Sequence, residues 1–185
     1  MVQHVVLVGL MGSGKTTVGK RVAARLGRHF VDADVALEEI ADRSIAEIFE
    51  RDGEAGFRDL EADTFEELLE HHEPCVIAGG GGLVLRPENR ARLRRPDVTV
   101  VYLEADPAFL ASRVKPKPHR PLLHGDVSPR EVLARLHDER AHLYAEVADL
   151  TVSVQPFHDG SASPKDALAT EVADRLLAHE AGARA

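Results

Sequence analysis

The chain contains one cysteine and no tryptophan, and aromatic residues make up only 4% of its 185 residues. A single cysteine, Cys75, excludes an intrachain disulfide and any zinc site built from several thiolates. No run approaches the ~18 consecutive apolar residues that a membrane span needs. Residues 1–4 also lack the basic segment of a secretory signal. These absences predict a protein of the reducing cytoplasm that does not enter a membrane.

Positive charge is also scarce, since 23 Lys and Arg residues stand against 31 Asp and Glu, a net charge of −8. This balance argues against a protein that binds nucleic acid or anionic membrane surfaces. Basic residues gather in one stretch, at Arg113, Lys115, Lys117 and Arg120. Such a cluster is usually a solvated face, and it gains meaning only if other segments point to an anionic ligand.

Short β-rich runs alternate with longer helical patterns, which predicts an α/β fold with a parallel sheet between helices. The predicted strands are Val5–Val8, His29–Val31, Cys75–Ala78, Val98–Leu103 and Leu150–Val154. Capping boxes predict helices that begin after Ser44 and Ser128, and Asp106-Pro107 predicts another helix start. Since 185 residues carry neither a repeat nor an interdomain linker, we expect one domain.

The segment GLMGSGKT at residues 9–16 matches the pattern G-x-x-x-x-G-K-[ST]. It follows an apolar strand and opens a helix, which is the context that phosphate binding requires. Its glycines let backbone N–H groups turn towards phosphate oxygens, and the helix N-terminus adds its positive end. We expect Lys15 to reach the β/γ-phosphates of a nucleotide and the Thr16 hydroxyl to bind Mg²⁺.

A nucleotide site is compatible with a GTP-dependent switch, but the sequence excludes that class. Switch proteins carry an N-K-x-D segment that reads the base and a D-x-x-G segment. The only asparagine is Asn89, which precedes Arg90, and no D-x-x-G occurs.

Two pairs of charged residues are candidates for binding an acceptor. Asp32 and Asp34 end the second predicted strand, where residues two apart project from the same face. One carboxylate can hold Mg²⁺ through water while the other accepts a hydroxyl proton, although Asp34 can instead cap the next helix. Arg58 and Glu61 have (i, i+3) spacing, which fits an exposed ion pair or an arginine fork held ready for a carboxylate. Spacing alone favours a surface position for Arg58.

Further candidates come from a glycine run and from two arginines. Residues 79–82 are all glycine and follow the third strand, so they form a flexible turn or allow close approach of a ligand to the backbone. Arg120 lies in a proline-rich basic segment and, on a closing lid, can stabilise charge on a transferring phosphoryl group. Arg140 lies beside Glu139 on a predicted helix, where an exposed charge is the simpler interpretation.

Together these segments resemble the shikimate kinase family over nearly the whole chain. The resemblance rests on GLMGSGKTTVGK at 9–20, FVDAD at 30–34, RSIAEIFERDGEAGFR at 43–58, GGG at 80–82, RPLL at 120–123, and Arg140 with Leu143-Tyr144. It implies a three-layer P-loop NTPase fold, with a five-stranded parallel sheet flanked by helices. It also implies a single kinase domain over 1–185, a mobile lid at about 113–126 and an acceptor-binding region at about 34–61.

The resemblance implies that the γ-phosphate of ATP is transferred to the 3-hydroxyl of shikimate, with Mg²⁺, in the pathway to chorismate and the aromatic amino acids. We also expect a monomer. The implied catalytic residues are Lys15, Asp34 and Arg120, and the implied metal ligands are Thr16 and Asp32. The implied ATP-binding residues are Gly12, Ser13, Gly14, Lys15, Thr16, Thr17, Arg113 and Arg120. The implied shikimate-binding residues are Asp34, Arg58, Gly80, Gly81, Gly82 and Arg140, with Ile45, Phe49 and Phe57 along the pocket and Glu61 orienting Arg58.

The sequence departs from the family at three places. Gly79 replaces a small polar residue that is frequent there, and residues 115–118 read KPKP, a stiffer and more basic lid than usual. The loop at 156–164 is longer than the corresponding family loop, so we assign no adenine contacts within it.

Two other functions are compatible with a nucleotide-binding site of this kind. Gluconate kinase shares the P-loop and an early aspartate pair, but Arg58, the RPLL segment and Arg140 favour shikimate. A nucleotide-binding regulator without catalysis is disfavoured, because Lys15 and Arg120 are both retained.

Overall fold

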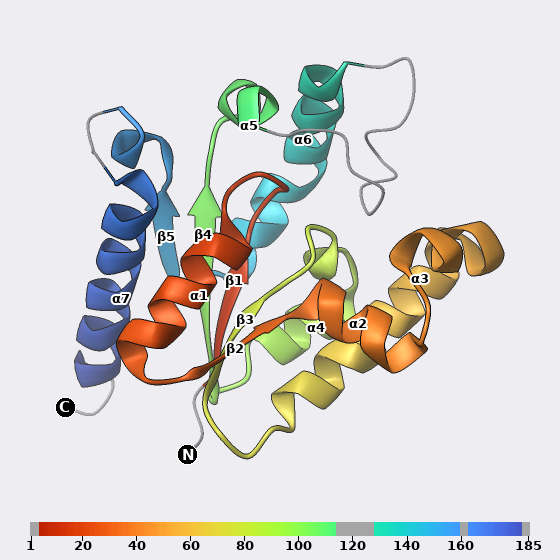
Figure 1. The fold of residues 1–185 in the computed structure, drawn as a ribbon, viewed down its shortest axis with the longest axis horizontal. Coiled ribbons are helices and arrows are strands. Elements are labelled where there is room, and N and C mark those ends of the chain that lie inside the picture. The colour runs from red at the N-terminus through yellow and green to blue at the C-terminus, as the bar shows by residue number, and fades with distance from the viewer. Residues whose placement is uncertain (1–3, 114–127, 160–162, 183–185) are drawn as a thin grey trace.

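The computed structural model describes residues 4–113, 128–159 and 163–182 (Figure 1). Its centre is a five-stranded parallel sheet with the order β2-β3-β1-β4-β5. The strands are β1 (His4–Val8), β2 (His29–Asp32), β3 (Cys75–Ala78), β4 (Val98–Glu104) and β5 (Leu150–Ser153). The predicted strands are confirmed in number and order, and their ends differ from the prediction by one residue at most.

The central strands are buried on both faces, which explains why they read as continuous apolar runs and not as alternating ones. In β1, all five residues of the sequence HVVLV are buried, and β3 is likewise buried throughout. β2 lies at one edge of the sheet and is only half-buried. The hydrophobic core therefore surrounds β1, β3 and β4, and these strands give the nucleotide motif a rigid support.

Helices cover both faces of this sheet, with α1 in front and α4 and α6 behind in the view of Figure 1. The α-helices are α1 (Lys15–Leu26), α2 (Ala33–Ala41), α3 (Ile45–Leu69), α4 (Pro87–Leu93), α5 (Pro107–Arg113), α6 (Pro129–Val147) and α7 (Pro164–Gly182). Two 3₁₀ turns, η1 (Leu83–Leu85) and η3 (Gln155–Phe157), complete the described elements. None of the described helices is long and apolar enough to cross a membrane.

The predicted helix starts are confirmed by their caps. Ser44 and Ser128 each form a capping box with the glutamate three residues later, and Pro129 occupies the first turn of α6. At Asp106 a carboxylate oxygen accepts hydrogen bonds from the backbone N–H groups of Ala108 and Phe109.

Helix α3 is the long element at the right of Figure 1, and it is broken in its first half. Gly53 has φ 69° and ψ −173° and so interrupts the helical backbone, a conformation that glycine adopts without a steric penalty. Residues on both sides of this kink and α2 form a small hydrophobic cluster of their own, which contains Leu37, Ile48 and Phe57. The predicted acceptor-binding region at 34–61 therefore has a separate core beside the sheet.

Candidate active site

A cavity of about 590 Å³ opens at the carboxyl ends of the central strands. Ligand sites of open parallel sheets lie at this edge. The cavity is lined by the start of α1, the β2–α2 junction, α3, the loop after β3, and residues of α6 and α7. All the sequence-predicted site residues line it except Arg120, which lies outside the described residues. Most of the predicted lid at 113–126 lies outside them as well.

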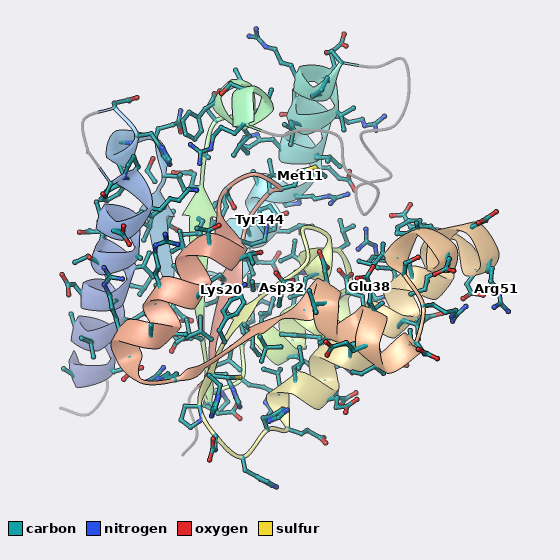
Figure 2. All side chains as sticks on the ribbon, in the orientation of Figure 1. Met11, Lys20, Asp32, Glu38, Arg51 and Tyr144 are labelled. Carbon is teal, nitrogen blue, oxygen red and sulfur yellow. The ribbon has the colours of Figure 1, made fainter. Side chains whose placement is uncertain are left out.

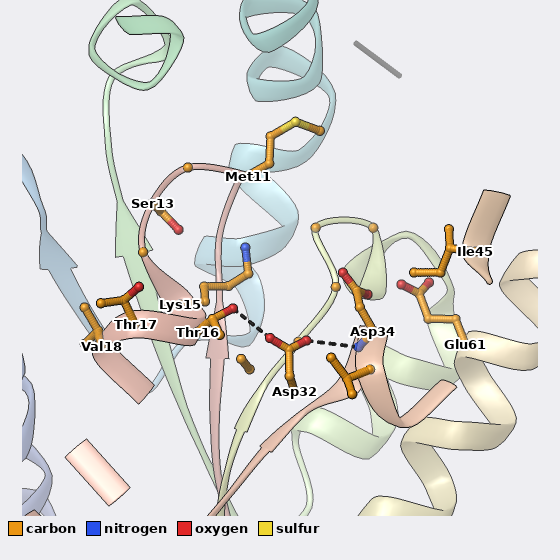
Figure 3. A pocket seen from close by; sticks show the side chains of 18 of the residues that line it. Met11, Ser13, Lys15, Thr16, Thr17, Val18, Asp32, Asp34, Ile45 and Glu61 are labelled. Atoms are coloured by element: carbon orange, nitrogen blue, oxygen red, sulfur yellow. Dashed lines mark hydrogen bonds between the residues drawn. The ribbon is translucent and has the colours of Figure 1, made fainter. Parts of the chain in front are cut away.

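The end of the cavity that the sequence predicts to bind phosphate is formed by the loop before α1 (Figure 3). Gly14 stands at the N-cap of α1 with φ 100°, and no side chain caps the helix. The N-terminus of α1 lines the cavity, so its backbone N–H groups and the positive end of the helix dipole suit an anion there. The Lys15 ammonium group donates hydrogen bonds to the carbonyl oxygens of Gly9 at 2.8 Å and Leu10 at 3.1 Å. This holds the charge of Lys15 beside the position where phosphates would lie.

Asp32 connects the phosphate end to the start of α2. Its Oδ2 accepts a hydrogen bond from the Thr16 hydroxyl at 2.7 Å, and its Oδ1 accepts one from the Asp34 backbone N–H at 3.2 Å (Figure 3). Asp32 is therefore the N-cap of α2, and the alternative that Asp34 caps the helix is wrong. The Asp34 carboxylate lines the cavity instead.

Arg58 is buried, so the surface position favoured by its spacing is wrong: only 9% of its surface is exposed. Its Nη1 donates to Glu61 at 2.8 Å, and this carboxylate is also buried. The Phe57 ring lies 5.0 Å from the guanidinium and stacks on Phe49. The (i, i+3) spacing correctly indicated Glu61 as the partner of Arg58. It could not show that neighbouring elements bury both side chains.

The absence of side chains at glycines in the loop after β3 leaves space for Arg58 and Glu61. A Cβ on Gly82 would lie 2.2 Å from Nη1 of Arg58, and one on Gly80 would lie 2.5 Å from Oε1 of Glu61 and 3.0 Å from Oδ1 of Asp34. Any side chain at these two positions would displace a charged group. Burial raises the pKa of Glu61, and the nearby Asp34 charge adds to this, while Arg58 and Arg140 oppose it.

Arg140 is also buried, so an exposed charge beside Glu139 is the wrong interpretation. Its Nη1 donates to the carbonyl oxygen of Gly81 at 3.1 Å. The Tyr144 hydroxyl, one helical turn further along α6, donates to the same oxygen at 2.5 Å. Sequence reasoning assigned no separate role to Tyr144, and the (i, i+4) spacing from Arg140 was the signal that could have suggested one.

Arg113 closes the other end of the cavity, where it makes a hydrogen bond of 2.9 Å with Nδ1 of His158. Its guanidinium lies 5.1 Å from the Phe109 ring. His158 belongs to the loop at 156–164, in which the sequence left the adenine contacts unassigned. The imidazole reaches the edge of the cavity, because His158 also lines it.

Comparison with known proteins places these features in a family. The shikimate kinase family pattern matches residues 11–177. The chain belongs to the shikimate kinase family. A shikimate kinase of Ruegeria pomeroyi is 45% identical over 174 residues, which is 94% of this chain and 83% of that protein. A shikimate kinase of Bradyrhizobium diazoefficiens is 42% identical over 183 residues, 99% of this chain and 84% of that protein.

Solved shikimate kinases have the same fold. The enzyme of Acinetobacter baumannii, solved in complex with shikimate, superposes with a TM-score of 0.85 at 34% identity and covers 97% of this chain and 95% of its own. A gluconokinase of Sinorhizobium meliloti superposes with a TM-score of 0.53 at 20% identity, over 96% of this chain and 97% of its own. That second likeness is one of fold alone. The predicted family and the predicted P-loop kinase fold are both confirmed.

Four buried side-chain atoms in the described residues make no hydrogen bond, and all belong to residues that line the cavity. They are Ser13 Oγ, Arg58 Nε, Glu61 Oε1 and Arg140 Nε. Buried polar atoms are nearly always paired in folded proteins, so each unpaired one calls for an explanation. Their common position makes the cavity suited to a polar ligand that can form hydrogen bonds with these atoms.

Proposed function

We propose that the chain is an ATP-dependent shikimate kinase that makes shikimate 3-phosphate and ADP, a step towards chorismate and the aromatic amino acids. The observation that carries the proposal is the acceptor end of the cavity. Two buried arginines, Arg58 and Arg140, lie there with Nε atoms that make no hydrogen bond, and the Asp34 carboxylate lies in the same cavity. An acceptor that bears both a carboxylate and hydroxyl groups, such as shikimate, can bind the two guanidinium groups through the first and the Asp34 carboxylate through the second.

The acceptor would be held by its carboxylate and activated at a hydroxyl. Guanidinium groups bind carboxylates with two parallel hydrogen bonds, which fixes orientation as well as charge. Asp34 would then accept the proton of the 3-hydroxyl as its oxygen bonds to the γ-phosphorus of ATP. The bond between that phosphorus and the β–γ bridging oxygen breaks, and ADP leaves with this oxygen.

The phosphate end would supply charge stabilisation. Lys15 would exchange the carbonyl oxygens of Gly9 and Leu10 for phosphate oxygens, where its charge offsets the charge that develops during transfer. We assign the same role to Arg120 and expect Arg113 to lie near the adenine. Gly12, Ser13, Gly14 and Thr17 would provide the rest of the nucleotide cradle.

Mg²⁺ fits this site, with Thr16 and Asp32 as the residues that would hold it. Their oxygens are 2.7 Å apart, so a hydroxyl and a carboxylate meet at the edge of the phosphate cradle. Mg²⁺ keeps several waters and takes only one or two carboxylates besides phosphate, so the lack of a larger acidic cluster in the described residues agrees with this assignment. When bound, the ion neutralises charge on the β- and γ-phosphates.

We further propose one kinase domain over 1–185, with residues 113–126 as the lid and 34–61 as the acceptor-binding region. The separate small core around Leu37 and Ile48 supports the second assignment. We infer a monomer, because one chain supplies both ends of the cavity. A cytoplasmic location accords with the use of ATP and with a single buried cysteine.

An assay that couples ADP release to a spectroscopic signal tests the proposal. Purified protein is given ATP and Mg²⁺ with shikimate, with gluconate, or with no acceptor. We expect ADP release with shikimate alone, and phosphate on the 3-hydroxyl by NMR of the product. Turnover of gluconate in preference to shikimate, or ADP release that needs no acceptor, would refute it.

A further inference from the structure

Tyr144 lies outside the lining of the cavity, yet it is bonded to the loop that shapes the acceptor end. The side chain is fully buried in α6, and Figure 2 places it near the centre of the molecule. Its ring stacks on Tyr102 of β4, with ring centroids 5.2 Å apart. The hydroxyl extends from this packed position to the carbonyl oxygen of Gly81 at 2.5 Å. A rigid ring thus holds one backbone atom of the acceptor loop.

The Gly81 carbonyl is a point where two parts of the acceptor end meet. Arg140 donates to it from the same face of α6 as Tyr144. The next residue, Gly82, lies against the Arg58 guanidinium, so closely that a Cβ there would overlap it. A shift of this loop would therefore push Gly82 against the Arg58 guanidinium. It would also displace the Gly81 carbonyl oxygen to which Arg140 donates.

The Tyr144 hydroxyl is suited to a constant structural bond. Burial raises the pKa of Tyr144 above its usual range, so the hydroxyl keeps its proton at neutral pH and can donate it to the Gly81 carbonyl. Without Tyr144, the Gly81 carbonyl would accept a hydrogen bond, within the described part of the chain, only from Arg140, a long side chain that must also bind the ligand. The tyrosine bond is independent of the ligand.

We propose that Tyr144 is a positioning residue for the acceptor: its hydroxyl fixes the Gly81 carbonyl and so sets the separation between the Arg58 and Arg140 guanidinium groups. The inference rests on the proposed function, since it treats these arginines as the binding site of the shikimate carboxylate. Tyr144 touches neither substrate and acts only through Gly81 and Arg140.

The test compares Tyr144→Phe with Tyr102→Phe, which removes a hydroxyl from the stacked partner ring and leaves the Gly81 bond in place. In Tyr144→Phe we expect the KM for shikimate to rise about fivefold, because one net hydrogen bond is lost from the support of the site. The KM for ATP and kcat should each change less than about twofold. Tyr102→Phe should leave all three constants near wild type.

A second measurement needs no substrate. Amide hydrogen exchange in the peptide that spans residues 79–85 should be faster in Tyr144→Phe than in Tyr102→Phe. The inference is overturned if exchange in this peptide is unchanged, if the KM for shikimate rises less than about twofold, or if both variants change equally. If the wild-type protein does not phosphorylate shikimate, the proposed function fails on its own, and exchange still decides whether Tyr144 holds the loop.

Discussion

The two ends of the cavity are built in different ways. The phosphate end is one continuous loop, in which backbone N–H groups, glycines and Lys15 lie within eight residues of sequence. The acceptor end is assembled from side chains on α2, α3 and α6 and from the glycine loop after β3. A site made of backbone depends on local conformation, whereas a site made of distant side chains depends on the packing that buries them.

This difference predicts different responses to substitution. At the phosphate end we propose that the charge of Lys15 acts directly on the transferring phosphoryl group, so its loss should reduce kcat. At the acceptor end the buried charges hold each other, so a substitution should act on acceptor binding and on stability. The following predictions run from the largest expected effect to the smallest.

Lys15→Met should give the largest effect, a fall in kcat of roughly 10²–10³, because a single charge aimed at the transferring phosphoryl group is lost. Circular dichroism and thermal unfolding should show an intact fold. The KM for shikimate should change little, since Arg58 and Arg140 lie at the other end of the cavity. A variant that retains more than about a tenth of wild-type turnover would contradict the role given to Lys15.

Sequence reasoning was most successful where the chemistry is local. The P-loop, the strands and the capping boxes are each encoded by neighbouring residues, and all of them are confirmed. The burial of Arg58 could not be predicted in this way, because it depends on Gly82, which is 24 positions away in the chain. The capping role of Asp32 was likewise hidden, since either aspartate fits the same pattern.

Arg58→Lys should give the next effect, because it keeps the charge and removes the planar fork. A single ammonium cannot make two parallel hydrogen bonds to a carboxylate and also retain the contact with Glu61. We expect kcat/KM for shikimate to fall by about thirtyfold, or ~2 kcal/mol, while nucleotide affinity without shikimate stays unchanged. Steady-state kinetics measure the change in kcat/KM for shikimate, and a nucleotide titration without shikimate measures the nucleotide affinity. A change below ~0.5 kcal/mol would mean that Arg58 behaves as a solvated surface residue.

Glu61→Gln should reduce activity less than Arg58→Lys does, and it should raise the thermal stability of the protein at neutral pH. The amide orients Arg58 less firmly, so we expect the KM for shikimate to rise about tenfold, as for a lost charge-assisted hydrogen bond. Burial raises the pKa of Glu61 in the folded state. The stability that this group contributes is therefore present below its unfolded value, ~4.3, and is lost as pH rises through the higher folded value. The variant should unfold at a higher temperature than wild type at pH 7, and the difference should vanish at acid pH.

Glu54→Gln is the matched control and should give the smallest effect. Glu54 also pairs with Arg58, at 3.3 Å, but 59% of its side chain is exposed, against 5% for Glu61. An exposed pair contributes about 0–1 kcal/mol, because water screens it and both side chains lose freedom. We therefore expect less than about a threefold change in the KM for shikimate, and little change in the unfolding temperature. Equal responses of the two variants, measured by the same kinetics and unfolding scans, would show that burial does not decide which carboxylate holds the arginine. The acceptor end would then depend on charge alone, and the contrast with the phosphate end would disappear.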